Sequence, residues 1–169
     1  HSASGATYGY YDDRWDPVVY DGEHSQGLSI GTPGSLAYTD RYTGIYQRIT
    51  GLEPGALYEF TIAGMVREEA LHPGEDPYAY QVQWASAPQA GDEWARVAGW
   101  QDLSWYTRCP CTAPGSFTVR TARFVAPARD VTLFVRVWKK WATTGRTIDV
   151  NVDGIGLRRC SPIPGAGRE

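Results

Sequence analysis

The sequence predicts an all-β fold, a two-sheet antiparallel β-sandwich of the jelly-roll type. Glycine and proline are frequent, with 19 and 11 copies among 169 residues. They leave a single uninterrupted window longer than 11 residues, at 128–144. Globular helices average about 11–12 residues, so this spacing nearly excludes an all-helical protein. Inside the window, side chains alternate with a period of two, which predicts a strand and not a helix.

Short runs of alternating side chains, bounded by turn signals, occur along the rest of the chain. Residues 1–15 lack such a period and are predicted to form an N-terminal arm, and residues 102–115 a long irregular connection. The predicted strands are Asp16–Tyr20, Ser25–Ile30, Thr43–Thr50, Ala56–Arg67, Tyr78–Ala85, Glu93–Trp100, Ser116–Val125, Val131–Trp138 and Arg146–Arg158. They predict a single domain, with the arm at 1–15, the β-sandwich at 16–158 and a C-terminal tail at 159–169.

The alternation also predicts which side chains share a face. From Val131 to Val137 the valines and the leucine point one way, so Trp138 falls on the opposite face of that strand. If the valine face is the core, Trp138 points outward. Gln47 shares its face with Ile45 and Ile49, which predicts a buried amide that requires hydrogen-bond partners.

Charge, hydropathy and motifs exclude several classes of function. The formal net charge is −3, which disfavours binding to the phosphate backbone of nucleic acids. No run approaches the ~18 apolar residues of a membrane span, so membrane insertion is not expected. The sequence contains no Gly-x-Ser-x-Gly, no His-Glu-x-x-His and no glycine-rich phosphate loop before a helix. We therefore expect a protein that is not an enzyme.

The cysteines bear on the compartment of the protein. Cys109 and Cys111 flank one proline, a spacing too tight for an easy disulfide between them. A second Cys or His pair, which a closed zinc site would need, is missing. We expect one bridge from Cys109 or Cys111 to Cys160, which would imply an oxidising location. The alternative is three unpaired cysteines in a reduced protein.

Tryptophan and tyrosine, with 7 and 11 copies, outnumber the 4 phenylalanines. Because these rings combine an apolar body with a polar group, they suit a β-sandwich core or a recognition surface that stacks on sugars. The candidates for ligand binding are Trp138, Trp141, Tyr80, Trp84 and Trp105. Core packing is the alternative for Tyr80 and Trp84. Packing against the long irregular connection is the alternative for Trp138 and Trp141.

Five segments, taken in order, carry a resemblance to a known family. They are Asp21–Ile30, Gly44–Ile49, Leu52–Phe60, Val131–Arg136 and Val150–Leu157. Their order resembles that of galactose-binding-like jelly rolls, in particular the carbohydrate-binding modules attached to xylanases and cellulases. The resemblance covers roughly Val18 to Leu157. It implies a β-sandwich, a secreted or cell-surface location and a non-catalytic role.

The resemblance also implies a structural calcium ion, bound in that family by an aspartate of the penultimate strand. Asp153 occupies the matching position. The alternative for Asp153 is a side chain that caps a turn. The family's opening Gly-Phe-Glu strand is absent here, which would leave a sheet edge open. Either the arm at 1–15 covers that edge by an irregular route, or a neighbouring chain adds a strand to it.

Two classes of function follow. The first is a non-catalytic extracellular carbohydrate-binding module that stacks a polysaccharide or cell-surface glycan on tryptophan and tyrosine rings. The second is a structural or interaction subunit of a cell-surface or extracellular filament assembly, which self-associates by strand exchange at an open sheet edge. An exposed aromatic platform favours the first class. Aromatic residues that are all buried, with a neighbouring chain at the open edge, favour the second.

Overall fold

The computed structural model describes residues 7–31, 41–68, 80–88, 93–139 and 147–161, and strands dominate these ranges. The strands are β1 (Thr7–Asp13), β2 (Ser25–Gly31), β3 (Arg41–Ile49), β4 (Leu57–Glu68), β5 (Tyr80–Pro88), β6 (Gln101–Asp102), β7 (Arg108–Pro110), β8 (Thr118–Val125), β9 (Val131–Lys139) and β10 (Ile148–Arg159). Two short 3₁₀ helices accompany them, η1 (Asp16–Val18) and η3 (Trp94–Arg96). No helix in the described ranges is long and apolar enough to cross a membrane.

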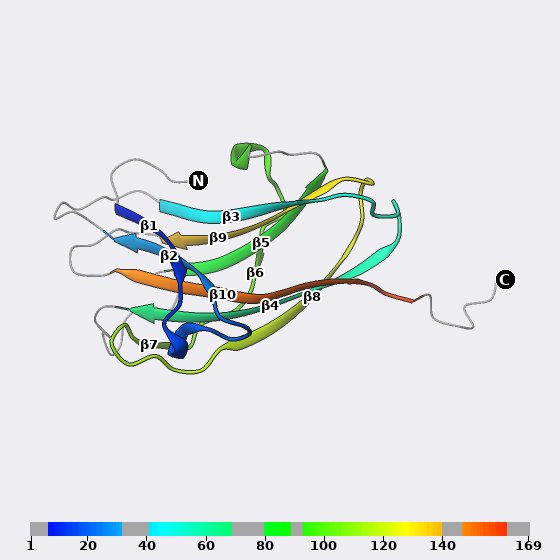
Figure 1. Ribbon diagram of the computed structural model, residues 1–169. Helices are drawn as coiled ribbons and strands as arrows, with labels where there is room; N and C mark the ends of the chain where they lie inside the picture. The colour runs from blue at the N-terminus through cyan, green and yellow to red at the C-terminus, as the bar shows by residue number, and fades with distance from the viewer. Residues whose placement is uncertain (1–6, 32–40, 69–79, 89–92, 140–146, 162–169) are drawn as a thin grey trace.

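The strands form two sheets that pack against each other (Figure 1). The four-stranded sheet has the order β3-β9-β5-β6. The six-stranded sheet has the order β1-β2-β10-β4-β7, and β8 also pairs with β4. Within the described ranges every strand pair is antiparallel except β4 with β7. The predicted two-sheet antiparallel β-sandwich is confirmed.

Period-two alternation gives each sheet one face toward a shared core. On β9, Val131, Leu133, Val135 and Val137 all point into it, as the sequence predicts. They belong to the same buried cluster as Val150 and the other inward-facing side chains of β10 and β4. Burying one such side chain contributes about 1.5–3 kcal/mol. The opposite face of each sheet is therefore left for other roles.

Part of the N-terminal arm, Thr7–Asp13, is a strand, which corrects the prediction of an irregular segment there. β1 pairs with β2 along its whole length, from Thr7 opposite Gly31 to Asp13 opposite Ser25. Its sequence shows no alternation because neither face of β1 is buried, and the adjacent Tyr10 and Tyr11, on opposite faces, are both exposed. The edge of β2 that was expected to be open is thus covered by the chain itself.

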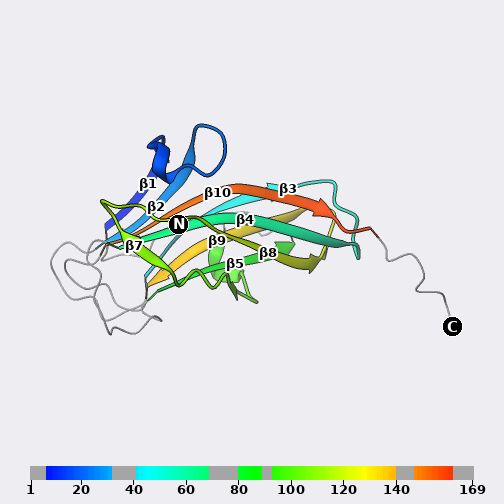
Figure 2. The same ribbon diagram turned by 90° about the horizontal axis from the view of Figure 1, so that it is seen from below.

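Two other predicted strands are 3₁₀ turns. Pro17 fixes its own backbone angle for the first turn of η1, so the segment Asp16–Tyr20 turns at once. In Figure 2 the dark-blue segment between β1 and β2 projects away from both sheets. In the second case, η3, Trp94 and Val97 are both buried three residues apart, which is the spacing of a 3₁₀ turn. The prediction of a strand at Glu93–Trp100 is therefore wrong.

The predicted disulfide is also corrected. Cys109 pairs in register with Arg67 near one end of β4, whereas the backbone N–H of Cys160 donates to the carbonyl of Leu57 at the other end. Strand geometry puts these two ends about 33 Å apart, and a disulfide requires Cα atoms within roughly 7 Å. Cys111 lies beside Cys109, so neither can reach Cys160. All three are thiols in the structure.

Candidate functional site

Three of the aromatic candidates lie inside the molecule. Tyr80, Trp84 and Trp105 are 1%, 2% and 2% exposed, within the core between the sheets. The Tyr80 hydroxyl donates a hydrogen bond to the Trp105 carbonyl (2.8 Å), and burial raises the pKa of Tyr80. The Trp105 ring lies so close to Gly64 that a Cβ atom there would be 2.1 Å from it. These three side chains cannot stack on an external ligand, so their prediction as binding residues is corrected.

Trp138 lies on the face of the four-stranded sheet that points away from the core, and it is half-buried. Its direct partners in the ladder are Tyr42 on β3 and Gln81 on β5. Direct cross-strand partners point to the same side of a sheet. The ring of Tyr42, the indole of Trp138 and the amide of Gln81 therefore form one row across three strands. Trp141, the expected companion of Trp138, lies outside the described residues.

A second row of polar side chains lies next to this one. Arg136 is the direct partner of Gln83, two residues along each strand from the first row. Arg136 Nε donates to Gln83 Oε1 (2.8 Å), and Gln83 Nε2 donates to Gln81 Oε1 (2.8 Å). We refer to the surface formed by both rows as the Trp138 face. Its residues are Tyr42, Gln81, Gln83, Arg136 and Trp138.

Two aromatic rings hold the guanidinium group of Arg136. Its Cζ atom lies 4.5 Å from the ring centroid of Tyr42 and 3.8 Å from that of Trp100. Trp100 in turn stacks on Trp94, with centroids 5.9 Å apart and planes at 7°. Trp100 Nε1 also donates to the carbonyl of Val97 (3.1 Å). The segment that begins with η3 therefore forms a wall along one side of the Trp138 face.

Gly44 determines how closely this wall approaches the sheet. A Cβ atom at this position would lie 2.6 Å from the Trp94 ring and 2.3 Å from the Val135 carbonyl oxygen. With no side chain there, Trp94 packs edge-on against Phe134, with ring centroids 5.0 Å apart. Phe134 is fully buried as a result. The wall thus covers Phe134, which lies in the next outward-facing row of the sheet, and leaves the two rows of the Trp138 face beside it.

One described carboxylate, that of Asp102, lies beside these rows because Asp102 pairs with Gln83. Its Oδ1 accepts a hydrogen bond from the backbone N–H of Ser104 (2.8 Å). Its Oδ2 accepts one from the hydroxyl of Tyr106. Both oxygens of Asp102 are therefore bonded within its own loop.

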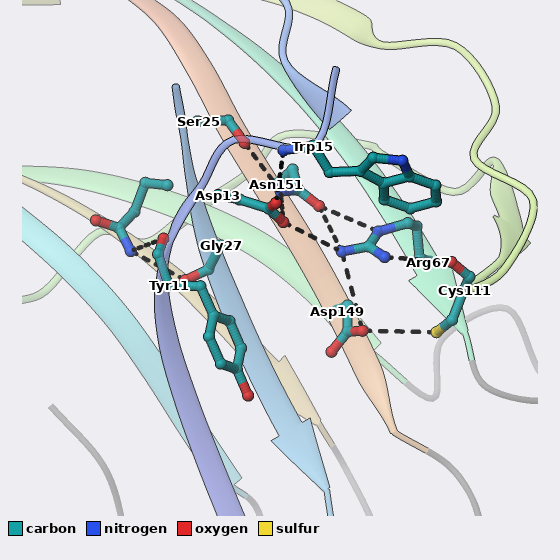
Figure 3. Close-up of polar contacts among 10 residues, drawn as sticks. Tyr11, Asp13, Trp15, Ser25, Gly27, Arg67, Cys111, Asp149 and Asn151 are labelled. Atoms are coloured by element: carbon teal, nitrogen blue, oxygen red, sulfur yellow. Dashed lines mark hydrogen bonds and ion pairs between the residues drawn. The ribbon is translucent and has the colours of Figure 1, made fainter. Parts of the chain in front are cut away.

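The outer face of the six-stranded sheet carries a different arrangement, a buried polar network (Figure 3). Asn151 on β10 is completely buried. Its Nδ2 donates to Asp13 Oδ2 (3.1 Å) and to Ser25 Oγ (2.9 Å). Its Oδ1 accepts from Arg67 Nε (3.1 Å) and Nη2 (2.8 Å). Asn151 therefore uses both its donor and acceptor groups to join β1, β2, β10 and β4.

Arg67 extends this network to the loop after β7. Its Nη1 donates to the carbonyl of Cys111 (3.3 Å), and its Nη2 lies 3.8 Å from Asp13 Oδ2 and 4.0 Å from Asp149 Oδ2. The Cys111 thiol donates to Asp149 Oδ2 (3.6 Å). These groups satisfy one another across four strands and a loop, so the network holds the sheet together.

Asp153, the expected calcium ligand, is surrounded by hydrogen-bond donors. Its Oδ2 accepts from the backbone N–H groups of Tyr20 (2.8 Å) and Asp21 (3.1 Å), and its Oδ1 accepts from that of Gly154 (2.6 Å). Calcium takes 6–8 oxygen ligands, and the described residues contain no group of three metal-binding side chains. The residues around Asp153 do not fit a calcium ion. Its carboxylate instead caps the turn and holds the loop before β2.

A pocket of about 600 Å³ opens between the edge of β3 and the second half of β10. Its walls are mostly apolar, with Ile45 and Ile49 on one side and Ile155 and Leu157 on the other. Gln47 also lines it but is exposed, so the prediction of a buried amide at that position is wrong. A sugar requires hydrogen-bond partners for its hydroxyl groups, and this pocket offers few. The Trp138 face is therefore the better candidate site.

Comparisons with known proteins bear on the fold. No protein-family model matches the sequence, and no curated protein matches it. A solved structure described as carbohydrate-binding modules from the β-sandwich superfamily matches with a TM-score of 0.52 at 13% identity. The match covers 94% of this chain and 56% of that one. A family 16 carbohydrate-binding module matches with a TM-score of 0.42 at 17% identity, over 92% of this chain and 87% of that one.

A third match is the CBM22-1 and GH10 part of xylanase 10B from Clostridium thermocellum, in complex with xylohexaose. Its TM-score is 0.42 at 12% identity, over 93% of this chain and 25% of that one. At these identities the matches establish the fold alone. The resemblance to β-sandwich carbohydrate-binding modules is confirmed at that level.

Sequence reasoning identified Trp138 but missed most of its neighbours. Gln81 and Gln83 alternate with the buried Tyr80 and Trp84 along β5, so period two alone puts them on the outward side. Their contact with Arg136 depends on which strands are adjacent, and alternation along one strand does not contain that information. Tyr42 was missed for the same reason.

Proposed function

We propose that this chain is a non-catalytic carbohydrate-binding domain that holds a polysaccharide or cell-surface glycan on the Trp138 face. The observation that supports this best is the row of Tyr42, Trp138 and Gln81 on the outward side of the four-stranded sheet. Sugars present apolar C–H faces that stack on aromatic rings and hydroxyl groups that bond to amides. The row offers both kinds of contact side by side.

The shared fold adds support, since the neighbour with a TM-score of 0.52 is described as carbohydrate-binding modules. A fold alone does not specify a function, so the residues of the Trp138 face are the main support. Polysaccharides and cell-surface glycans lie outside the cell, so we also propose a secreted or cell-surface location.

A non-catalytic role fits the position of the carboxylate beside the face. Glycoside hydrolysis normally uses two carboxyl groups about 5–9.5 Å apart on either side of the sugar bond. Among the described residues, the ladder places one carboxylate beside Gln83, that of Asp102. Both its oxygens accept hydrogen bonds from its own loop. We therefore assign this face to binding.

The test is affinity gel electrophoresis of Trp138→Ala against a panel of soluble polysaccharides. The variant should lose at least tenfold in affinity, because about 1.4 kcal/mol of ring stacking corresponds to a factor of ten. Trp15→Ala is the matched control, since Trp15 is 46% exposed on the other side of the sandwich. Equal retention of both variants and the parent protein would refute this site.

The alternative is self-association by strand exchange, which was expected at an open edge of the sheet. β1 of the same chain covers that edge of β2, so a second chain does not find it open. The described six-stranded sheet ends at β1 on one side and at β7 and β8 on the other, and the four-stranded sheet ends at β3 and β6. Light scattering of the purified protein at several concentrations tests this alternative directly. A constant monomer mass would argue against it, and a concentration-dependent mass would favour it.

A further inference from the structure

The ring of Tyr11 lies flat on the outer face of the six-stranded sheet. Tyr11 on β1 is the direct partner of Gly27 on β2, and Gly9 lies two residues earlier on the same face of β1. A Cβ atom at Gly9 would overlap the far end of the Tyr11 ring, and one at Gly27 would lie 3.1 Å from the Tyr11 Cβ atom. Because both glycines lack a side chain, the ring can rest on the backbone between β1 and β2 (Figure 3).

The other face of this ring points to solvent. Tyr11 is 54% exposed, although the backbone covers the side of the ring that faces the sheet. A ring over glycine stabilises an end strand, and it also provides the flat apolar surface on which the C–H face of a sugar stacks. The pairing of β1 with β2 holds the ring in place before a ligand arrives, which reduces the entropy lost on binding.

A hydroxyl and a carboxylate lie in the row of side chains that the Tyr11 ring covers. Gly9, Ser29 and Asp149 are direct partners across β1, β2 and β10, so they share one side of the sheet. That side points away from the core, because Leu28, the next residue to Ser29, is buried in it. Neighbouring strands lie about 4.8 Å apart. A sugar ring stacked on Tyr11 therefore brings its hydroxyl groups within reach of Ser29 and Asp149.

The carboxylate of Asp149 can accept further hydrogen bonds. A carboxylate has about four acceptor positions. The Cys111 thiol, a weak donor, lies 3.6 Å from its Oδ2 atom, and Arg67 Nη2 lies 4.0 Å from the same oxygen, so neither contact is a strong hydrogen bond. The Asp149 side chain is 23% exposed. Asp13 also lies near Arg67, so two carboxylates face one guanidinium here, which favours a neutral sugar over an acidic one.

We infer that Tyr11, Ser29 and Asp149 form a second sugar-binding site, on the opposite side of the sandwich from the Trp138 face. Its ligand is a neutral sugar residue within a polysaccharide. The C–H face of the sugar stacks on Tyr11, and adjacent hydroxyl groups donate to Asp149 and bond to Ser29. The site uses no residue of the Trp138 face, so it extends the binding surface beyond the proposed function.

The experiment isolates this site by titration calorimetry in a Trp138→Ala background, with neutral hexasaccharides of xylan, cellulose and mannan as probes. We expect one binding site per chain for at least one probe. Tyr11→Ala should weaken that binding at least tenfold, and Tyr11→Phe, which keeps the ring, should recover most of the loss. The matched control is Tyr10→Ala, which should change the affinity less than twofold, because Tyr10 is 47% exposed on the opposite face of β1. Equal losses in Tyr10→Ala and Tyr11→Ala would overturn the inference.

A second measurement needs no substitution within the site. In the Trp138→Ala protein, the hexasaccharide that binds should shift the backbone amide resonances of Gly9, Gly27 and Ser29, which lie under and beside the ring. Unshifted amides at all three positions would overturn the inference. Melting temperatures show whether Tyr11→Ala remains folded, since its ring also covers two glycines. Where it does not, the amide shifts decide.

The outcomes also distinguish this inference from the proposed function. Binding that disappears entirely with Trp138→Ala would overturn the second site and leave the Trp138 face intact. Binding that is unchanged in Trp138→Ala but lost with Tyr11→Ala would support the second site and count against the first. Binding of no polysaccharide or hexasaccharide by the parent protein would overturn both.

Discussion

The two sheets present contrasting faces on the sides that point away from the core. On the six-stranded sheet, Asn151 and Arg67 bond to each other and to their neighbours, and the protein itself satisfies them. On the four-stranded sheet, Trp138 and Gln81 lie in one row, and within the described ranges no other sheet covers the outward side of that row. Both faces combine large and polar side chains, so composition alone does not separate them. They differ in their hydrogen bonds: those of Asn151 form a closed network within the protein, whereas those of the Trp138 face form a chain that ends at Gln81.

A closed hydrogen-bond network and an open one serve different purposes. A polar group whose partners all lie within the protein costs free energy when one partner is removed. A polar group at the end of a hydrogen-bond chain can be changed with little effect on folding, yet it decides what binds. Substitutions on the first face should therefore change stability, and substitutions on the second should change affinity.

The largest effect should come from breaking the closed network with Asn151→Ala. The substitution leaves Arg67, Asp13 and Ser25 without a shared partner in a buried position. We expect the free energy of unfolding to fall by about 3 kcal/mol, measured by urea denaturation. The control is Gln81→Ala on the other face, with an expected loss below about 0.5 kcal/mol. Similar losses in both variants would contradict the comparison.

Gly44→Ala should disturb the wall beside the Trp138 face. The added methyl group would overlap the Trp94 ring and the Val135 carbonyl, so one of them must move. Overpacking of this kind costs about 2 kcal/mol, and the tryptophan fluorescence should shift as Trp94 is displaced. Gly156→Ala is the control, because nothing lies within 4 Å of a Cβ atom at that position. An unshifted tryptophan emission spectrum of Gly44→Ala would contradict this prediction, because it would show that Trp94 keeps its position beside the added methyl group.

Glu59→Gln should give a smaller effect that depends on pH. Hydrogen bonds from Arg158 and then Arg123 hold the pKa of Glu59 below its usual 4.5. The ionised group therefore adds stability above about pH 4.5, and this contribution is lost as the pH falls through the lower folded-state pKa. The variant should be less stable than the parent at pH 7, and the gap should close in acid. A gap that stays constant from pH 7 to pH 2 would contradict this account.

Calcium should have the smallest effect. Because both carboxylate oxygens of Asp153 accept backbone N–H groups, adding millimolar calcium should leave the melting temperature unchanged. Magnesium serves as the control for ionic strength. A rise of several degrees with calcium alone would show that the ion binds at residues this structure does not bring together.

Much of the fold could be read from side-chain periodicity. β9, which buries one face against the other sheet, carries the alternation that predicts it. β1 does not, because side chains on both of its faces, such as Tyr10 and Tyr11, are exposed, and its place in the sheet depends on pairing with β2. The segment that contains η3 resembles a strand in its apolar content. In the structure Trp94 and Val97 are buried at a spacing of three, which is the spacing of a 3₁₀ turn.

The candidate site was harder to predict, for a physical reason. Alternation sorts residues into two faces but does not state which face is inward. Trp84 and Trp138 illustrate this, since each lies on an aromatic-rich side of its strand and only one is outside the core. The chain of hydrogen bonds from Arg136 to Gln81 requires the order of strands, which sequence periodicity does not supply.

The register shift in β10 also affects the order in which the sandwich should unfold. The pairing of β10 with β2 ends at Val152 opposite Gln26, and the register with β4 slips between Asp153 and Gly156. Beyond that point β10 has a strand on one side only, so backbone amides on its other side face water. Amide hydrogens there should exchange with solvent sooner than those at Ile148 to Val152. Thermal fraying would then start at the C-terminal end of β10 and move toward Ile148.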